Sequence, residues 1–198
     1  MQKAIEDFVR TLISRGLSKL TITAYKSDLL QLEEFLLRYF EDEKIDVNQV
    51  TRLYLRDFLR YLSVNDRNNR TLARKATTLK SFFQFCEKNR YCSKNPASKL
   101  HIPKFEKKLP KCFSEKEMED LLNIPDLSSK FGIRNRAILE LIYSSGLRIS
   151  EIANCKIGQI DLAEKQIRVI GKGNKERIVP LSSKAKIAIR NYTATREQ

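Results

Sequence analysis

The hydrophobic period changes from helical to extended within Gln166-Ile-Arg-Val-Ile-Gly-Lys-Gly-Asn-Lys-Glu-Arg-Ile-Val-Pro-Leu181. The β-rich runs at 166–170 and 177–181 flank a glycine-containing segment, which predicts a β-hairpin with Lys172 between two glycines at its tip. Gly173 follows Lys172 where a P-loop would have Ser or Thr, so the segment is not a nucleotide-binding loop.

A second segment, Ser145-Gly-Leu-Arg-Ile-Ser-Glu151, lies upstream between two helical patterns. A helix from about residue 133 is expected to end at Gly146, and Ser150 is expected to cap the next one, 151–156. Arg148 then lies near a helix N-terminus, where free backbone amides and a guanidinium can converge on a phosphate. The plainer alternative is a surface ion pair between Arg148 and Glu151.

Helical patterns surround these two segments in the second half of the chain. Ser114 and Glu117 form a capping box, and Ser182 starts a last helix. The apolar residues of that last helical pattern are Ala185, Ile187, Ala188 and Ile189.

The first 95 residues have helical periodicity throughout, which predicts four helices. The first ends before Gly16, the second is capped by Thr21 and runs toward Tyr39, and the third opens at Thr51. The fourth covers 71–88 and has apolar residues on one side: Leu72, Ala76, Leu79, Phe83 and Cys86.

The opposite side of the fourth helix is polar and contains no acidic residue. Its members recur at spacings of 4, 3, 4 and 3 residues: Arg70, Arg74, Thr77, Ser81 and Gln84. Such a row suits the major groove of DNA, where Arg, Gln and Ser or Thr reach base edges and phosphates. An ordinary exposed face is the alternative.

The positive charge is concentrated in the middle of the chain. The whole sequence has 38 Lys and Arg against 24 Asp and Glu, a net charge of +14. Residues 51–105 hold 13 basic and 3 acidic side chains, whereas residues 1–50 hold 7 basic and 9 acidic ones. A clustered excess of positive charge of this size indicates a surface that binds a phosphate backbone. The alternative is a basic surface that is only solvated.

Prolines divide the chain into two domains. Asn95-Pro96 ends the helical pattern, and Pro103 and Pro110 prevent a helix through the basic stretch that follows. We therefore expect a helical domain over 1–95, an extended linker over 96–112 and a second domain over 113–198. His101 falls in the linker and is expected to be incidental.

Composition argues against metal, disulfide and membrane chemistry. The four cysteines form no Cys-x-x-Cys pair and His101 is the one histidine, so we expect no metal site and reduced, mostly buried thiols. No apolar run approaches the roughly 18 residues of a membrane span, and the N-terminus lacks a signal-peptide pattern. A cytoplasmic location without membrane contact is expected.

Together, Ser145–Ile152 and Val169–Leu181 resemble the tyrosine recombinase (integrase) family, and are most similar to its bacterial Xer branch. The resemblance covers the whole chain, including the linker that ends Lys-Leu-Pro-Lys111. It implies a mainly α fold with a small β-hairpin or sheet. The N-terminal part would be a four-helix, SAM-like core-binding domain, followed by a truncated α+β catalytic domain.

The resemblance also implies a metal-free and cofactor-free phosphoryl transfer on DNA. In that family a tyrosine attacks the scissile phosphate and forms a 3′-phosphotyrosyl link. Arg148 matches the first catalytic arginine, which stabilises charge on the phosphate, and Lys172 matches the general acid for the departing 5′-oxygen. The implied partners are a duplex recombination site and a second recombinase protomer. The expected DNA-contacting residues are Arg70, Arg74, Thr77, Lys80, Ser81, Lys175 and Arg177.

The sequence departs from the family after the hairpin. It has no His-x-x-Arg box, no later His or Trp, and Tyr192 lies too early to match the nucleophile. We therefore expect a truncated recombinase that binds DNA without cleaving it, and whose second domain exposes apolar surface. Two alternatives are a short DNA-binding relative that regulates or competes at recombination sites, and an enzyme that uses Tyr192 or is completed in trans.

Overall fold

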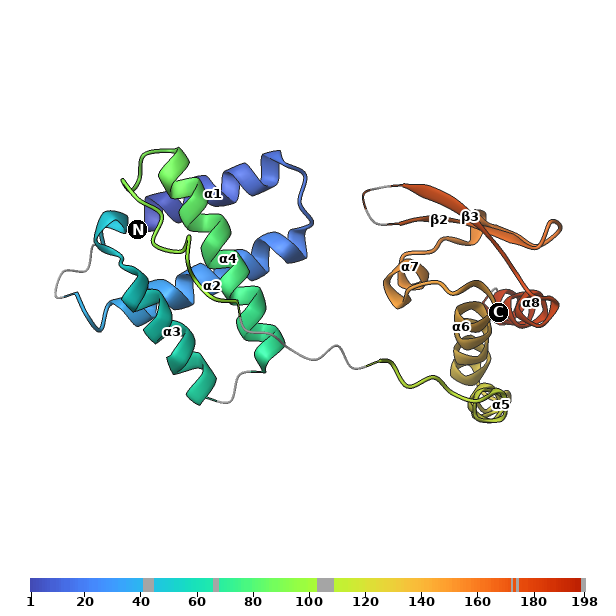
Figure 1. The fold of residues 1–198 in the computed structure, drawn as a ribbon. Helices are drawn as coiled ribbons and strands as arrows, with labels where there is room; N and C mark the ends of the chain where they lie inside the picture. The colour runs from blue at the N-terminus through green and yellow to red at the C-terminus, as the bar shows by residue number, and fades with distance from the viewer. Residues whose placement is uncertain (41–44, 66–67, 103–108, 172, 174, 197–198) are drawn as a thin grey trace. The chain divides into compact units, whose positions relative to one another are not determined.

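The computed structural model describes residues 1–40, 45–65, 68–102, 109–171, 173 and 175–196. The chain forms two compact units, Met1–Lys108 and Leu109–Gln198 (Figure 1). Among the residues that the structure describes, those of the first unit form helices and no strand, whereas the second unit combines helices with a small antiparallel sheet. The predicted fold class, mainly α with a small sheet, is therefore confirmed.

Four α-helices and one short 3-10 helix build the first unit, as the periodicity predicts. They are α1 Gln2–Ser14, α2 Lys19–Leu36, η1 Val47–Gln49, α3 Arg52–Val64 and α4 Asn69–Lys88. Helix α4 packs against the other three helices, and aromatic rings fill the space between them. Phe8 of α1 meets Phe82 of α4 edge to face with 5.5 Å between ring centroids.

The helix starts differ from the predicted ones where two capping residues compete. Ser18, not Thr21, caps α2, because the Ser18 hydroxyl accepts from the backbone N–H of Thr21. Helix α4 begins two residues earlier than predicted, since Asn68 accepts from the backbone N–H of Arg70. Thr51 is the N-cap of α3, as predicted.

The chain after α4 stays in contact with the first unit. Ala97 and Leu100 are buried in the same core as the four helices. The Asn95 carboxamide accepts from the backbone N–H of Ala97, and Leu100 donates to the carbonyl of Ala97. These contacts hold the first part of the segment expected to be a linker, whereas residues 103–108 lie outside the described residues.

A buried ionic network joins α2 to α4 in the first unit. Asp28 is 1% exposed and accepts from the Lys75 ammonium at 2.6 Å, the Thr78 hydroxyl at 2.9 Å and the Arg74 guanidinium. Lys75 is 5% exposed and also donates to the Gln31 side chain at 2.7 Å. Each buried charge therefore has an opposite charge and further hydrogen bonds, as burial requires.

Helices and a three-stranded sheet form the second unit. The helices are α5 Glu115–Asn123, α6 Lys130–Ser145, α7 Ile149–Ala153, η2 Ile157–Gln159 and α8 Ser183–Arg196. The strands are β1 Ile160–Asp161, β2 Gln166–Ile170 and β3 Glu176–Pro180, in the order β1-β2-β3. The antiparallel β2–β3 pair confirms the predicted hairpin, while the two-residue β1 is too short to be recognised from sequence.

A small core holds this unit together. The sheet contributes Ile167 and Val169, which alternate with exposed positions along β2, and α6 and α8 contribute Leu141 and Ile189. Ile187 of α8, in contrast, is 61% exposed. The sequence predicts that the second domain exposes apolar surface, and further apolar side chains of this unit are indeed exposed: Phe113, Ile124, Leu127, Phe131, Tyr143, Ile149, Ile157 and Ile178.

Helix ends in the second unit follow mostly from the predicted signals. The Ser114–Glu117 capping box is present, and Gly146 ends α6 with φ of +60°, a conformation that favours glycine. Ser182 accepts from the backbone N–H of Ala185 at the start of α8. Ser150 does not cap α7, because the helix begins at Ile149 with Arg148 in the N-cap position.

The cysteines are less buried than the sequence suggests. Cys86 and Cys92 are buried, Cys155 is half-buried and Cys112 is exposed, and all four are free thiols. Burial raises the pKa of the Cys86 thiol to about 12. Across the described residues, no helix combines the length and hydropathy that a membrane span requires.

The buried network in the first unit makes a testable prediction about stability. Asp28→Asn removes the charge that compensates the Lys75 ammonium, so it should lower the free energy of opening of α2 and α4 by about 3–5 kcal/mol. Amide hydrogen exchange of those helices measures this loss.

A second variant separates lost charge pairing from lost packing. Asp28→Asn combined with Lys75→Met leaves neither buried ion, and should recover most of the protection. Lys26→Ala, on the exposed side of α2, is the control and should change protection by no more than about 0.5 kcal/mol. A double variant that is no more stable than Asp28→Asn would contradict the charge explanation.

Candidate active site and nucleic-acid interface

Arg148 lies at the junction between α6 and α7. Leu147, which precedes it, is buried in the core of the second unit, and this fixes the backbone from which the Arg148 side chain leaves. The side chain is 68% exposed, and its Nη1 lies 3.0 Å from Oε1 of Glu151. The surface ion pair between Arg148 and Glu151, which the sequence offered as an alternative to phosphate binding, is therefore present. Most of the Arg148 side chain nevertheless remains exposed.

Glu151 holds two arginines at once. Its Oε2 accepts from the backbone N–H of Arg148 at 2.9 Å, and its two oxygens accept from Nη1 and Nη2 of Arg177 at 3.0 and 2.9 Å. The hydrogen bonds from Arg177 and from the Arg148 backbone lower the pKa of Glu151 to about 2. Glu151 thus stays ionised and joins the start of α7 to strand β3.

This carboxylate fixes the base of the hairpin next to Arg148. Arg177 pairs with Val169 in the β2–β3 register, and Gly171 donates to the Lys175 carbonyl at 2.7 Å to close the turn. A Cβ at Gly171 would lie 2.7 Å from Nη1 of Arg177, so glycine leaves the room that the guanidinium occupies. Lys172 itself lies outside the described residues.

Glu151 is the site residue that sequence reasoning undervalued. The three-residue spacing from Arg148 was visible, but it indicated only a local surface pair. The bond to Arg177 spans 26 residues and depends on how the hairpin packs against α7. Arg177, expected among the DNA-contacting residues, has both terminal nitrogens engaged by Glu151.

The arrangement suits an anionic ligand. Arg148 presents a largely exposed guanidinium at a helix start, and a guanidinium can stabilise charge on phosphoryl oxygens through paired hydrogen bonds. Among the residues that the structure describes, no group of three or more His, Cys, Asp or Glu side chains could hold a metal ion.

The polar row of α4 lies on the outside of the first unit. Arg70, Arg74, Thr77 and Gln84 are exposed, and Ser81 is half-buried, as is the neighbouring Lys80. The buried Asp28 binds Arg74, which orients the guanidinium while 43% of its side chain stays accessible. The row therefore presents basic and polar groups from one rigid helix.

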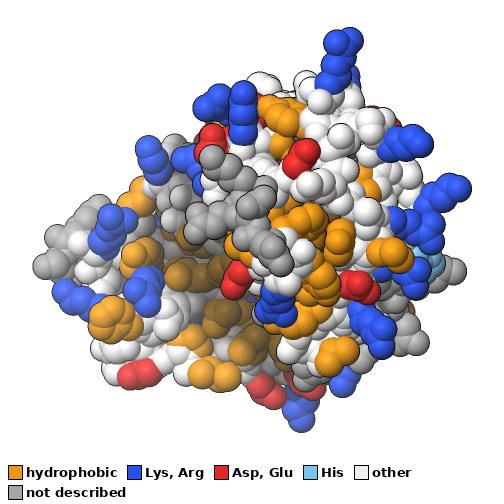
Figure 2. Space-filling model, turned by 90° about the vertical axis from the view of Figure 1, so that its left-hand side faces the viewer, with side chains coloured by type: hydrophobic (Ala, Val, Ile, Leu, Met, Phe, Trp, Pro, Cys, Tyr) orange, Lys and Arg blue, Asp and Glu red, His pale blue; other side chains and the backbone are white. Residues whose placement is uncertain are grey.

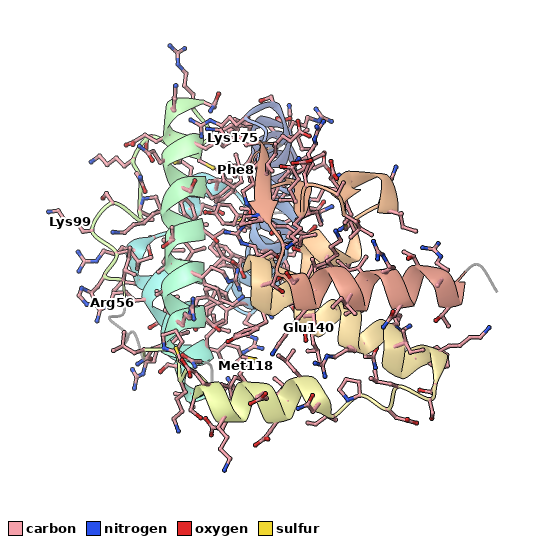
Figure 3. The ribbon with its side chains drawn as sticks, turned by 90° about the vertical axis from the view of Figure 1, so that its right-hand side faces the viewer. Phe8, Arg56, Lys99, Met118, Glu140 and Lys175 are labelled. Carbon is pink, nitrogen blue, oxygen red and sulfur yellow. The ribbon has the colours of Figure 1, made fainter. Side chains whose placement is uncertain are left out.

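Basic side chains are also widespread elsewhere on the surface. Figure 2 shows Lys and Arg side chains over much of the visible face, with Asp and Glu between them. Lys175, beside the hairpin turn, is exposed and labelled in Figure 3.

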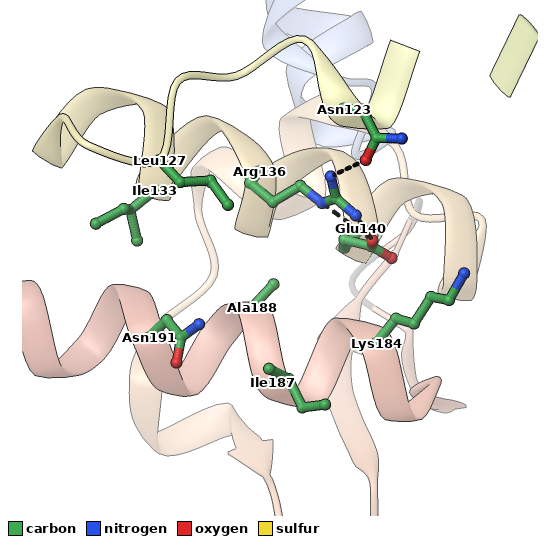
Figure 4. Close-up of a pocket in the computed structure, with 9 residues that line it drawn as sticks. All are labelled: Asn123, Leu127, Ile133, Arg136, Glu140, Lys184, Ile187, Ala188 and Asn191. Carbon is green, nitrogen blue, oxygen red and sulfur yellow. Dashed lines mark hydrogen bonds and ion pairs between the residues drawn. The ribbon is translucent and has the colours of Figure 1, made fainter. Parts of the chain in front are cut away.

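A pocket of about 540 Å³ lies between α5, α6 and α8 (Figure 4). Its Arg136 side chain is used in contacts between the helices. Arg136 donates to the Leu122 carbonyl at 2.6 Å, to Asn123 at 2.8 Å and to the buried Glu140 at 2.9 Å. These bonds tie α5 to α6. Arg148 does not line this pocket, so the pocket is separate from the candidate active site.

Tyr192 lies in another part of the second unit. It is half-buried on α8 and lines a pocket of about 320 Å³ together with Ile138, Ile152 and Cys155. Among the residues that the structure describes, those that line the pocket beside Tyr192 do not include Arg148.

Comparison with known proteins identifies similarity in both units. Residues 5–89 match the phage integrase N-terminal SAM-like domain, and residues 111–198 match the phage integrase family. Tyrosine recombinase XerD of Staphylococcus epidermidis is 38% identical over 183 residues, which are 91% of this chain and 61% of that protein. XerD of Staphylococcus saprophyticus is 35% identical over 98% of this chain. The chain thus spans about three fifths of the length of these relatives.

Solved structures share the fold. A lambda integrase dimer bound to a core site gives a TM-score of 0.73 at 15% identity, covering 100% of this chain and 69% of that one. XerH recombinase bound to a palindromic difH substrate gives 0.69 at 22% identity, covering 92% and 55%. The predicted combination of a SAM-like helical domain and part of an integrase-type domain is therefore confirmed.

The Glu151 network makes a prediction about pH. Because the folded pKa of Glu151 is lowered from 4.5 to about 2, its ion pairs stabilise the second unit fully above about pH 4.5 and lose that effect as the pH falls toward 2. An NMR titration of the Glu151 carboxyl group should give a midpoint near 2.

Replacing Arg177 tests whether its hydrogen bonds cause the low pKa of Glu151. Arg177→Met should raise the midpoint of Glu151, whereas Lys175→Met, two residues away on the hairpin, should leave it unchanged. An unaltered midpoint in Arg177→Met would show that the bidentate contact does not set the ionisation of Glu151.

Proposed function

Because the chain belongs to the phage integrase family of tyrosine recombinases, we propose that it binds duplex DNA at a recombination site as part of a site-specific recombinase. Residues 1–95 would be the core-binding domain and residues 113–198 the N-terminal part of the catalytic domain, joined by the segment 96–112. The observation that carries the proposal is the placement of Arg148, through Glu151, beside the hairpin that bears Lys172.

The first unit would contact DNA through the polar row of α4. A helix fits the major groove, where Arg70 and Arg74 can reach phosphates or guanine edges and Thr77, Ser81 or Gln84 can reach bases. Lys80 and Lys175 would add contacts to the backbone. The fixed position of Arg74, held by Asp28, supports contact at a defined place on the duplex.

The second unit would contribute to phosphoryl transfer. In the family reaction a tyrosine oxygen bonds to phosphorus, the bond from phosphorus to the 5′-oxygen breaks, and that oxygen takes a proton. Arg148 would neutralise charge on the non-bridging oxygens, and the Lys172 ammonium would supply the proton. The 198 residues contain no histidine or tryptophan after Lys172, so these two residues would act with groups that this sequence does not supply.

A paired gel experiment tests the proposal. The chain is incubated with a nicked suicide duplex carrying a Xer-type site, and the mixture is run on native and denaturing gels. We expect a shifted band on the native gel and no covalent protein–DNA adduct on the denaturing gel. The absence of a shift would contradict DNA binding. An adduct that Tyr192→Phe abolishes would contradict the view that this sequence lacks a nucleophile.

Arg70 offers a quantitative prediction about the α4 row. Arg70→Ala should weaken duplex binding and reduce the slope of log K against log salt by about 0.9, because one phosphate contact is lost. Lys3→Ala, an exposed cation on α1, is the matched control and should leave the slope unchanged. If Arg70→Ala behaves like Lys3→Ala in affinity and slope, the row does not contact DNA.

A further inference from the structure

A basic groove of about 600 Å³ lies in the first unit, away from the α4 row. It runs between the outer side of α3, the start of α4 and the chain after residue 98. Its polar and charged lining consists of Arg52, Arg56, Asp57, Arg60, Ser63, Asn69, Lys99 and His101. None of these residues belongs to the α4 row or to the hairpin.

The groove carries an excess of positive charge. Arg52, Arg56, Arg60 and Lys99 are all exposed, and Asp57 is the one acidic residue among the described lining residues. Within the described part of the chain, none of these four cations has a carboxylate within ion-pair distance. Their charges therefore remain available to a ligand, and the groove concentrates positive potential.

The cations form two facing walls. Arg52, Arg56 and Arg60 recur every four residues along one side of α3, which separates their successive Cα atoms by about 6 Å along the helix axis. Lys99 belongs to the other wall, and in Figure 3 Arg56 and Lys99 both project outward on the same side of the unit.

The wall that carries Lys99 is held in place by the core. Leu100 is buried, as is Leu72 of α4, and both line the base of the groove. The backbone hydrogen bond from Leu100 to Ala97 fixes the turn that presents Lys99. The groove is therefore formed before any ligand binds, which lowers the entropy cost of binding.

The composition of the groove favours a phosphodiester backbone as its ligand. Several cations with hydroxyl and amide groups match the contacts that proteins make with phosphate oxygens. No Phe, Tyr or Trp is among the described lining residues, so the groove lacks the stacking surfaces typical of single-strand binding sites.

The groove adjoins the proposed DNA-binding row at the start of α4. Asn69 lines the groove, and Arg70, the next residue, is the first member of the row. We propose that the groove between α3 and residues 99–101 binds the phosphate backbone of the same duplex, beside the segment contacted by α4. This inference rests on the proposed function, because it assumes that α4 contacts DNA.

Salt-dependent binding tests the groove. The full chain, Arg56→Gln/Arg60→Gln and Lys99→Gln are titrated with a duplex carrying a Xer-type site and with a scrambled duplex of equal length. Since each lost phosphate contact reduces the salt slope by about 0.9, the double variant should lose about 1.8 and Lys99→Gln about 0.9. Both duplexes should be affected equally, because backbone contacts carry no sequence information. Lys3→Gln is the control, and circular dichroism confirms equal helix content.

The outcomes separate this inference from the proposed function. If Arg70→Ala lowers the slope while the groove variants bind like the full chain, the groove proposal is wrong and the α4 proposal stands. If the groove variants change the preference between the two duplexes, the groove reads bases and the backbone assignment is wrong. If the full chain binds neither duplex, both proposals fail.

Discussion

The carboxylate of Glu151 is the constraint on which the second unit's candidate site depends. It accepts hydrogen bonds from the Arg148 backbone and from both terminal nitrogens of Arg177, and so connects the start of α7 to strand β3. Without that link, Arg148 and the hairpin would be held together only by a small core. An anion that remains charged at every physiological pH is well suited to this task, because two guanidiniums near each other need a compensating charge.

In the core of the first unit, too, a single carboxylate accepts hydrogen bonds from several donors and joins two elements. Asp28 accepts from Lys75, Thr78 and Arg74, so a buried carboxylate joins α2 to α4 and also orients a side chain on the surface. Buried ions are costly unless each is paired, and this cost makes the arrangement specific: other packings of α2 on α4 would leave Lys75 or Asp28 without a partner. The rigid presentation of the α4 row follows from this packing.

Local patterns predicted most of the elements and misplaced some of their ends. Helical periodicity located α1–α4, α6 and α8, and the alternation in Gln166–Leu181 located the hairpin. The errors fall where neighbouring residues have similar capping tendencies, as with Ser18 and Thr21 or Arg148 and Ser150. Periodicity also identifies apolar positions without telling whether another element covers them, as the exposed Ile187 illustrates.

The two-part organisation, the family resemblance and the polar row on α4 could be predicted from residue order and helical spacing, and the resemblance also predicted a role for Arg148. Which charges meet depends on how the helices and strands pack together. Glu151 and Arg177 are 26 residues apart and Asp28 and Lys75 are 47 apart, and the groove combines α3 with residues beyond α4. Ion pairs and clefts of this kind arise when packed elements bring distant side chains together, and the period of a local pattern holds no information about that packing.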